Sequence, residues 1–180
     1  LLFFDPAAEY VAIPELFAPI NSLSTKFGFS FAKGYLYNEV ENFGMYRNIY
    51  VRNFTINALT QNLSSLVLFT ATYINSMGKG VASTSNDTYS SVSEKAGSYA
   101  TIVLVERGNG TIIAFGDLTF LREPYCYVED NHKLVMNLVS LITSVKVPVE
   151  EIEEGVKQEV AKPDLPVGTE TVSYTHLTLP

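Results

Sequence analysis

The chain of 180 residues carries a formal net charge of -7, and 47% of its residues are hydrophobic while 17% are charged. This composition excludes a disordered chain and is typical of one globular domain with its own core. The 12 lysines and arginines are spread thinly, which excludes a general nucleic-acid binder, because neutralising phosphates needs clustered cations. No apolar run approaches the roughly 20 residues that cross a bilayer, so we expect no membrane contact by this chain.

The two ends of the chain predict an incomplete domain with an added tail. Residues 1–4 are apolar and end at Asp5-Pro6, which predicts a buried strand whose neighbouring upstream strands are missing. We expect an α/β domain over residues 1–147, incomplete at its N-terminus. Residues 148–171 are rich in Glu and Pro and predict an acidic linker. Residues 172–180, VSYTHLTLP, resemble translated adapter sequence at the end of a metagenomic reading frame, and we exclude them from the fold.

The first half of the core alternates apolar runs with polar breaks. Residues 14–27 have apolar side chains at helical spacing, and Gly28 follows in the position of a C-terminal cap. The elements expected after this helix are short strands or a hairpin at 29–31 and 35–37, an irregular loop at 38–48, a strand at 49–54, one helical turn at 57–63 and a buried strand at 66–70.

The second half contains the strongest strand signals. After a strand at 81–84, we interpret the Ser-rich residues 85–98 as a loop. Two β runs, Tyr99–Val105 and Thr111–Phe115, are separated by residues 106–110, in which the Asn109-Gly110 pair predicts an antiparallel hairpin. The closing helix, Asn131–Thr143, presents one apolar face that should cover the last strand, formed by Leu134, Leu138, Leu141 and Ile142.

Residues 110–142 therefore read as a strand, a Gly-Asp turn, an acidic and aromatic loop, and a helix. This order is half of a parallel α/β unit, and ligands usually bind at the carboxyl ends of the strands in open α/β sheets. We predict a three-layer α/β fold of the flavodoxin-like or amidotransferase-like kind, with a mixed, mostly parallel sheet. The loop after residue 116 is the first place to look for a ligand.

Several short motifs carry a resemblance to a known family. They are Phe115-Gly116-Asp117, the Thr119-Phe120-Leu121 step, the Asp130-Asn131 pair that opens a helix, and Asn137-Leu138-Val139. Together with the opening strand, they resemble the class I glutamine-amidotransferase-like superfamily. The nearest group is the uncharacterised domain of unknown function 4350, with its relatives in gliding-motility and ABC-transporter auxiliary proteins. The resemblance covers residues 1–143.

The resemblance implies a binding or scaffolding domain within a larger, membrane-associated or surface assembly. True amidotransferases carry a cysteine on a strand-to-helix elbow flanked by glycines, and no such elbow occurs here. Where the family often has a His-Pro-Ile-Thr-like step, this chain has Asn57-Ala58-Leu59-Thr60. We therefore expect no glutamine hydrolysis. The expected partner is a protein or a small polar ligand, and we expect no cofactor.

The acidic loop offers a group of candidate ligand-binding residues, Asp117, Glu123, Glu129, Asp130 and His132. Carboxylates and an imidazole suit divalent cations, so a hydrolase or metal-dependent enzyme using Asp117, Glu129, Asp130 and His132 is the alternative function. We favour a structural interpretation without a metal, in which Asp117 caps the turn after the strand and Asp130 or Asn131 caps the helix.

Cys126 could be drawn as a nucleophile with His132 as base and Glu129 as orienting group. A nucleophilic cysteine needs an electropositive pocket that lowers its pKa. The acidic residues around Cys126 argue against such a pocket, so we predict an incidental thiol and no catalytic residue.

The irregular loop at 38–48 and the residues before it gather aromatic and hydrogen-bonding groups. The members are Tyr35, Tyr37, Phe43, Tyr46, Arg47 and Asn48. Rigid aromatics and arginine suit contact with a sugar, a peptide or a protein, so we take Tyr46, Arg47 and Asn48 as binding candidates. The alternative is a long loop pinned to the core by its own aromatic side chains.

Four Asn-x-Ser/Thr patterns begin at Asn53, Asn62, Asn86 and Asn109. They match the acceptor pattern for N-glycosylation and slightly favour an extracytoplasmic location.

Overall fold

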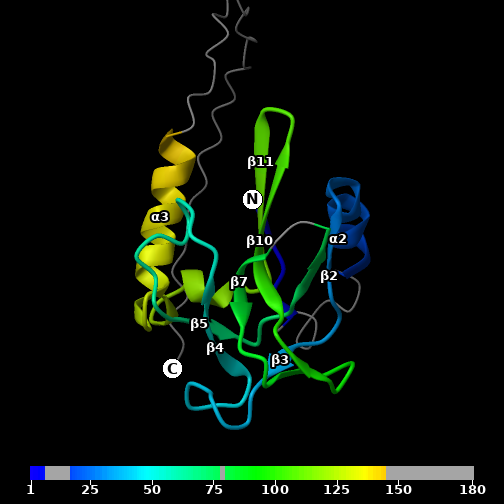
Figure 1. The fold of residues 1–180 in the computed structure, drawn as a ribbon, viewed down its shortest axis with the longest axis vertical. Coiled ribbons are helices and arrows are strands. Elements are labelled where there is room, and N and C mark those ends of the chain that lie inside the picture. The colour runs from blue at the N-terminus through cyan, green and yellow to red at the C-terminus, as the bar shows by residue number, and fades with distance from the viewer. Residues whose placement is uncertain (7–16, 78–79, 145–180) are drawn as a thin grey trace, which may run out of the picture. The chain divides into compact units, whose positions relative to one another are not determined.

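The computed structural model describes residues 1–6, 17–77 and 80–144. The expected linker at 148–171, the expected tail at 172–180 and the start of the expected helix at 14–27 lie outside these residues. Within the described ranges, eleven strands occur with two α-helices (Figure 1).

The main sheet has six strands in the order β1-β11-β10-β7-β4-β5. Only β1 and β11 run parallel, and every other neighbouring pair in this sheet is antiparallel. The six strands are β1 (Leu2–Phe3), β4 (Asn48–Phe54), β5 (Leu66–Phe69), β7 (Gly80–Thr84), β10 (Ala100–Arg107) and β11 (Gly110–Phe115).

Two smaller sheets and two helices complete the described fold. β2 (Phe29–Phe31) pairs with β6 (Ile74–Ser76), and β3 (Leu36–Tyr37) pairs with β8 (Thr88–Ser90), which in turn pairs with β9 (Ala96–Gly97). The helical segments are α2 (Phe17–Ser24), the 3-10 turns η1 (Thr25–Phe27), η2 (Thr119–Leu121) and η3 (Tyr125–Tyr127), and α3 (Asn131–Ser144).

The predicted flavodoxin-like or amidotransferase-like fold with a mostly parallel sheet is wrong. The chain is rich in strands, and its main sheet contains one parallel pairing. The prediction failed because continuous apolar runs such as Leu66–Phe69 report burial on both faces of a strand and not its direction.

Most strand positions predicted from the sequence are confirmed, but of the pairings only the β10–β11 hairpin is. The segments 29–31 and 35–37 are strands, yet they pair with β6 and β8 and not with each other. The Ser-rich segment at 85–98 is more than a loop, since it contains β8 and β9. The β10–β11 hairpin is confirmed, and its turn is Gly108-Asn109, one residue earlier than expected, with Gly108 at φ 56°.

The main sheet is covered on both faces by apolar side chains. On one face, Ile102 and Phe115 belong to a cluster with Leu134 of α3. On the other, their neighbours Val103 and Ala114 pack with a second cluster that includes Phe31. Leu138 of α3 is also buried, whereas Ile142, expected on the covered face, is 49% exposed. Alternation along β10 and β11 therefore builds two cores from one hairpin.

The outer edge of β5 is closed by side chains from the start of α3. β5 ends the six-stranded order, so alternate residues direct their N–H and C=O groups away from β4. Asn131 takes both groups of Val67, because its Oδ1 accepts from the Val67 N–H at 3.2 Å and its Nδ2 donates to the Val67 carbonyl at 2.9 Å. The same Nδ2 donates to the Tyr125 carbonyl at 3.0 Å. Figure 1 shows α3 beside β5.

Two aspartates extend this closure in both directions along β5. Asp130 Oδ2 accepts from the backbone N–H groups of Ser64 and Ser65 at 2.7 and 3.2 Å. Asp117 Oδ2 accepts from the N–H of Phe69 at 2.9 Å. One amide and two carboxylates therefore do along this edge what a neighbouring strand would do, and the edge cannot template a further strand.

Gly116 is required by the close approach of two chain segments. Its N–H donates to the Thr101 carbonyl at 2.9 Å, and its carbonyl accepts from the Thr72 N–H at 2.8 Å. A Cβ at this position would collide with the Thr72 carbonyl. The glycine of the Gly-Asp pair thus allows Asp117 to lie at the end of β11, beside the edge of β5.

We predict that Asn131→Ala destabilises the fold by about 2–4 kcal/mol, because it leaves both backbone groups of Val67 unpaired inside the protein. Urea unfolding followed by circular dichroism measures this loss. Ser140→Ala, at an exposed position of the same helix, is the matched control and should change stability by less than about 0.5 kcal/mol. Equal stability of the two variants would show that the edge needs no such cap.

Candidate functional site

Asp117 is fully buried, and its carboxylate is occupied by the backbone. Besides the bond from Phe69, its Oδ1 accepts from the Thr119 N–H at 2.7 Å, which fixes the turn into η2. The expected turn cap is therefore present, and it also joins β11 to β5. Burial raises the pKa of Asp117 to about 7, against the lowering effect of the hydrogen bonds from Phe69 and Thr119.

Asp130 bonds to a distant segment and does not cap its own helix. Besides the Ser64 and Ser65 contacts, its Oδ1 lies 2.7 Å from Lys133 Nζ. Burial alone would raise the pKa of Asp130, but hydrogen bonds from Lys133 and from the Ser64 and Ser65 backbone lower it. Its carboxylate oxygens are thus engaged by the fold.

The other acidic-loop candidates lie outside this bonded network. Glu123 accepts a hydrogen bond from the Tyr127 hydroxyl at 2.9 Å at the surface. Glu129 and His132 are exposed, and Cys126 is half-buried in η3. Among residues 1–6, 17–77 and 80–144, no three His, Cys, Asp or Glu side chains come together as a group that could hold a metal ion. The structure therefore does not gather Asp117, Glu129, Asp130 and His132 into one cluster.

The aromatic candidates do come together, on the outer face of the β3–β8–β9 sheet. We call this the tyrosine surface, and it consists of Tyr35, Tyr37, Tyr46, Arg47 and Tyr89. The Tyr37 and Tyr89 rings are stacked at 5.5 Å, and Tyr46 meets Tyr37 edge-on at 6.1 Å. The Arg47 guanidinium lies 4.4 Å from the Tyr35 ring centroid and 5.2 Å from that of Tyr46.

Arg47 places a positive charge at one end of this surface, next to the Tyr46 hydroxyl. Arg47 Nε donates to the Tyr46 hydroxyl at 3.0 Å. This hydrogen bond, followed by one that involves Tyr35, holds the pKa of Tyr46 below its usual range. Tyr46 and Tyr89 nevertheless remain 41% and 38% exposed, so the surface is ordered by its own contacts and still open to a partner.

The loop at 38–47 is held by its backbone and by other side chains: the Tyr46 and Arg47 carbonyls accept from the Asn38 and Thr70 N–H groups at 2.8 and 3.0 Å. Asn38 Oδ1 accepts from the Val40 and Glu41 backbone, and Asn48 Nδ2 donates to the Phe43 carbonyl at 3.0 Å. The Phe43 ring lies edge-on to Phe69 of β5. Asn48, a binding candidate from sequence, therefore serves the loop's own structure.

Sequence reasoning missed Tyr89. Its segment was interpreted as a Ser-rich loop, whereas β8 pairs Tyr89 directly with Tyr37. The signal was the short alternation Thr88-Tyr89-Ser90, in which Thr88 and Ser90 are buried and Tyr89 points outward. Three residues are too few for periodicity to separate a strand from a loop.

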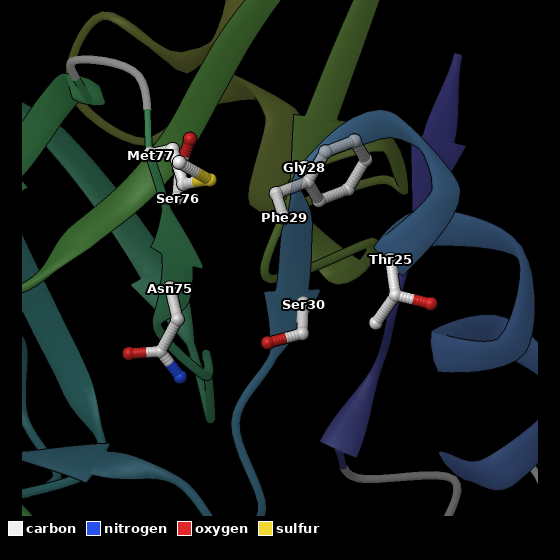
Figure 2. Close-up of a pocket in the computed structure, with 7 residues that line it drawn as sticks. All are labelled: Thr25, Gly28, Phe29, Ser30, Asn75, Ser76 and Met77. Atoms are coloured by element: carbon white, nitrogen blue, oxygen red, sulfur yellow. The ribbon is translucent and has the colours of Figure 1, made fainter.

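Two surface hollows lie away from all the sequence-predicted candidates. One, of about 430 Å³, is lined by residues of the paired strands β2 and β6 and of the segments beside them, none of them charged: Thr25, Gly28, Phe29, Ser30, Asn75, Ser76 and Met77 (Figure 2). The other, of about 490 Å³, lies where β4 meets β7 and is lined mainly by polar groups, including Arg52 and Asn53. Both hollows are open to solvent and neither contains a cluster of titratable groups.

Comparison with known proteins identifies a fold neighbour and no family. No protein-family model matches the chain, and no curated protein matches it. Among solved structures, the chain is similar to one described as the mmIFT52 N-terminal domain, with a TM-score of 0.56 and 15% sequence identity. The match covers 71% of this chain and 59% of that chain, so this chain spans less than two thirds of its neighbour. The likeness establishes a shared fold, which is not the predicted flavodoxin-like one.

No helix among the described residues is long and apolar enough to cross a membrane.

We predict that Asp117 makes the fold less stable as the pH rises. Its pKa of about 7 in the folded chain exceeds its ordinary value of 3.8, so the folded chain holds a proton that the unfolded chain has released. The stabilising effect of this proton is complete below about pH 4 and is lost as the pH rises through about 7. Between these values, the free energy of unfolding should fall by up to about 1.4 kcal/mol per pH unit.

The measurement is urea unfolding of the wild type and Asp117→Asn at pH 5, 6, 7 and 8. The variant loses a carboxylate acceptor, so its absolute stability changes as well, and the readout is the slope with pH. The difference in free energy between the two proteins should change steadily from pH 5 to about pH 7 and then level off. A difference that stays constant across the range would contradict the raised pKa.

Proposed function

We propose that this chain is a non-catalytic protein-binding domain of a larger assembly, and that the tyrosine surface is its contact site. The observation that carries the proposal is the exposed stack of aromatic rings with Arg47 held against them. Tyrosine and arginine dominate the energetics of protein contacts, because they offer a large area and fixed donors at low entropic cost. A surface ordered before binding loses less entropy on association.

The bonding of the acidic loop supports a binding role over the enzymatic alternative. Asp117 and Asp130 each use Oδ2 to accept from backbone N–H groups of β5 or the residues before it, and their Oδ1 atoms bond to Thr119 and Lys133. A catalytic acid or base needs an oxygen within reach of a substrate proton. The side chains of the tyrosine surface, in contrast, contact one another and leave Tyr46 and Tyr89 exposed to a partner.

The fold neighbour fits this proposal without naming a partner. Its description, an N-terminal domain, makes it one part of a longer protein. A comparable place in a longer chain suits a domain that binds other proteins. The resemblance to domain of unknown function 4350, with its transport and motility relatives, stays a prediction that points the same way.

We predict that Tyr46→Ala and Arg47→Ala preserve folding and remove binding. Because Phe43, Asn38 and Asn48 pin the loop, each substitution should change the free energy of unfolding by less than about 1 kcal/mol. Binders selected from a displayed library of protein fragments against the wild-type chain should lose about 30-fold or more in affinity on either substitution.

The control is Tyr127→Ala, which removes an exposed tyrosine from η3 outside the tyrosine surface. It should leave the affinity of those binders unchanged. The proposal fails if selected binders tolerate Tyr46→Ala and Arg47→Ala equally well. It also fails if Tyr46→Ala unfolds the chain, since Tyr46 would then be a pinning residue.

A further inference from the structure

The tyrosine surface has a second end whose charge differs from the Arg47 end. Tyr37 and Tyr89 stack across the β3–β8 pairing. Glu39 follows Tyr37 by two residues, and Glu94 lies in the turn that joins β8 to β9, where its N–H donates to the Ser90 carbonyl at 2.8 Å. Both glutamates are exposed, and neither forms an ion pair within the described residues.

The electrostatic effect of these glutamates reaches the rings. Burial raises the pKa of Tyr37 first, and the charges of Glu39 and Glu94 raise it further. The carboxylates of Glu39 and Glu94 therefore place negative charge near the Tyr37 ring, whose face is itself negative.

A similar group of residues elsewhere in the chain binds an arginine side chain. Arg52 lies 4.2 Å from the Tyr50 ring centroid, and its Nη1 is 3.2 Å from Glu41 Oε2. A tyrosine face and a glutamate together thus hold one arginine of the chain itself. Tyr37, Tyr89, Glu39 and Glu94 offer the same combination of ring and carboxylate, and within residues 1–6, 17–77 and 80–144 no cation is found over the Tyr37 or Tyr89 ring.

We infer that a basic segment of the partner places an arginine or lysine side chain over the Tyr37–Tyr89 pair, beside the carboxylates of Glu39 and Glu94. This inference rests on the proposed function and adds the chemistry of the partner. A cation over a tyrosine face gains attraction from the ring, and more when a carboxylate is near. The Arg47 end of the same surface repels a second cation, which sets the direction in which a basic segment lies.

The test uses two synthetic peptides of 12 residues that contain Leu, Ser and three Arg, or citrulline in place of each Arg. Citrulline keeps the shape of arginine and removes its charge. Titration into the ¹⁵N-labelled chain should shift the backbone amides of Tyr37 and Tyr89 with the arginine peptide. The citrulline peptide should bind about 2- to 30-fold more weakly.

Charge variants locate the effect on this chain. The double variant Glu39→Gln with Glu94→Gln should weaken binding of the arginine peptide by a similar factor. Glu106→Gln with Glu129→Gln removes the same charge from exposed positions elsewhere and should leave the affinity unchanged. All four positions are exposed, so folding is preserved in both proteins.

Three outcomes would overturn the inference: equal binding of the citrulline peptide, equal weakening by both double variants, or amide shifts confined to other surfaces. A neutral oligosaccharide, cellohexaose, that shifts the same amides more strongly than the arginine peptide would also overturn it. These outcomes leave the proposed function standing if fragments selected on the wild type still lose affinity with Tyr46→Ala. If the arginine peptide does not bind as expected and Tyr46→Ala also leaves the affinity of the selected fragments unchanged, the proposed function fails as well.

Discussion

The closure of the β5 edge by Asp117, Asp130 and Asn131 is the constraint on which the rest of the described structure depends. An exposed edge strand would leave unpaired N–H and C=O groups that water or another strand must satisfy. Here the segment between β11 and α3 satisfies them, which fixes the start of α3 and the course of the loop before it. A polar side-chain network therefore determines where an apolar helix packs.

Aromatic contacts connect the β5 edge to the loop that carries Tyr46 and Arg47. The Phe69 N–H donates to Asp117. The centroid of the Phe69 ring lies 4.6 Å from that of Tyr125 and 6.5 Å from that of Phe43. Phe43 in turn anchors the loop that carries Tyr46 and Arg47. The acidic loop, first considered as a ligand site, thus supports the aromatic loop from behind. Asp117 and Asp130 of the acidic loop accept from backbone N–H groups, whereas Tyr46 and Tyr89 of the tyrosine surface remain exposed.

The sequence predicted most strands and the last helix but missed β6, β8 and β9, and of the strand pairings it predicted only the β10–β11 hairpin. Local patterns determine an element, since Leu66–Phe69 and Asn131–Ser144 were recognised from their apolar residues. Direction and partner depend on contacts between residues far apart, such as Leu2 of β1 with Ala114 of β11. The aspartates were ambiguous for a related reason. A carboxylate that caps a distant backbone N–H and one that binds a ligand look identical in sequence, whereas Tyr89 was hidden in a strand too short to show a period.

The most direct test of this account is native-state hydrogen exchange of the β5 amides, measured by NMR. The Val67 and Phe69 amides point away from β4, toward Asn131 and Asp117, and on an open edge they would exchange rapidly. If side chains close this edge, both amides are protected from exchange as strongly as those of Leu66 and Leu68. Asn131→Ala should then speed up the exchange of the Val67 amide selectively. Rapid exchange of Val67 and Phe69 in the wild-type chain would contradict the claim that side chains close this edge.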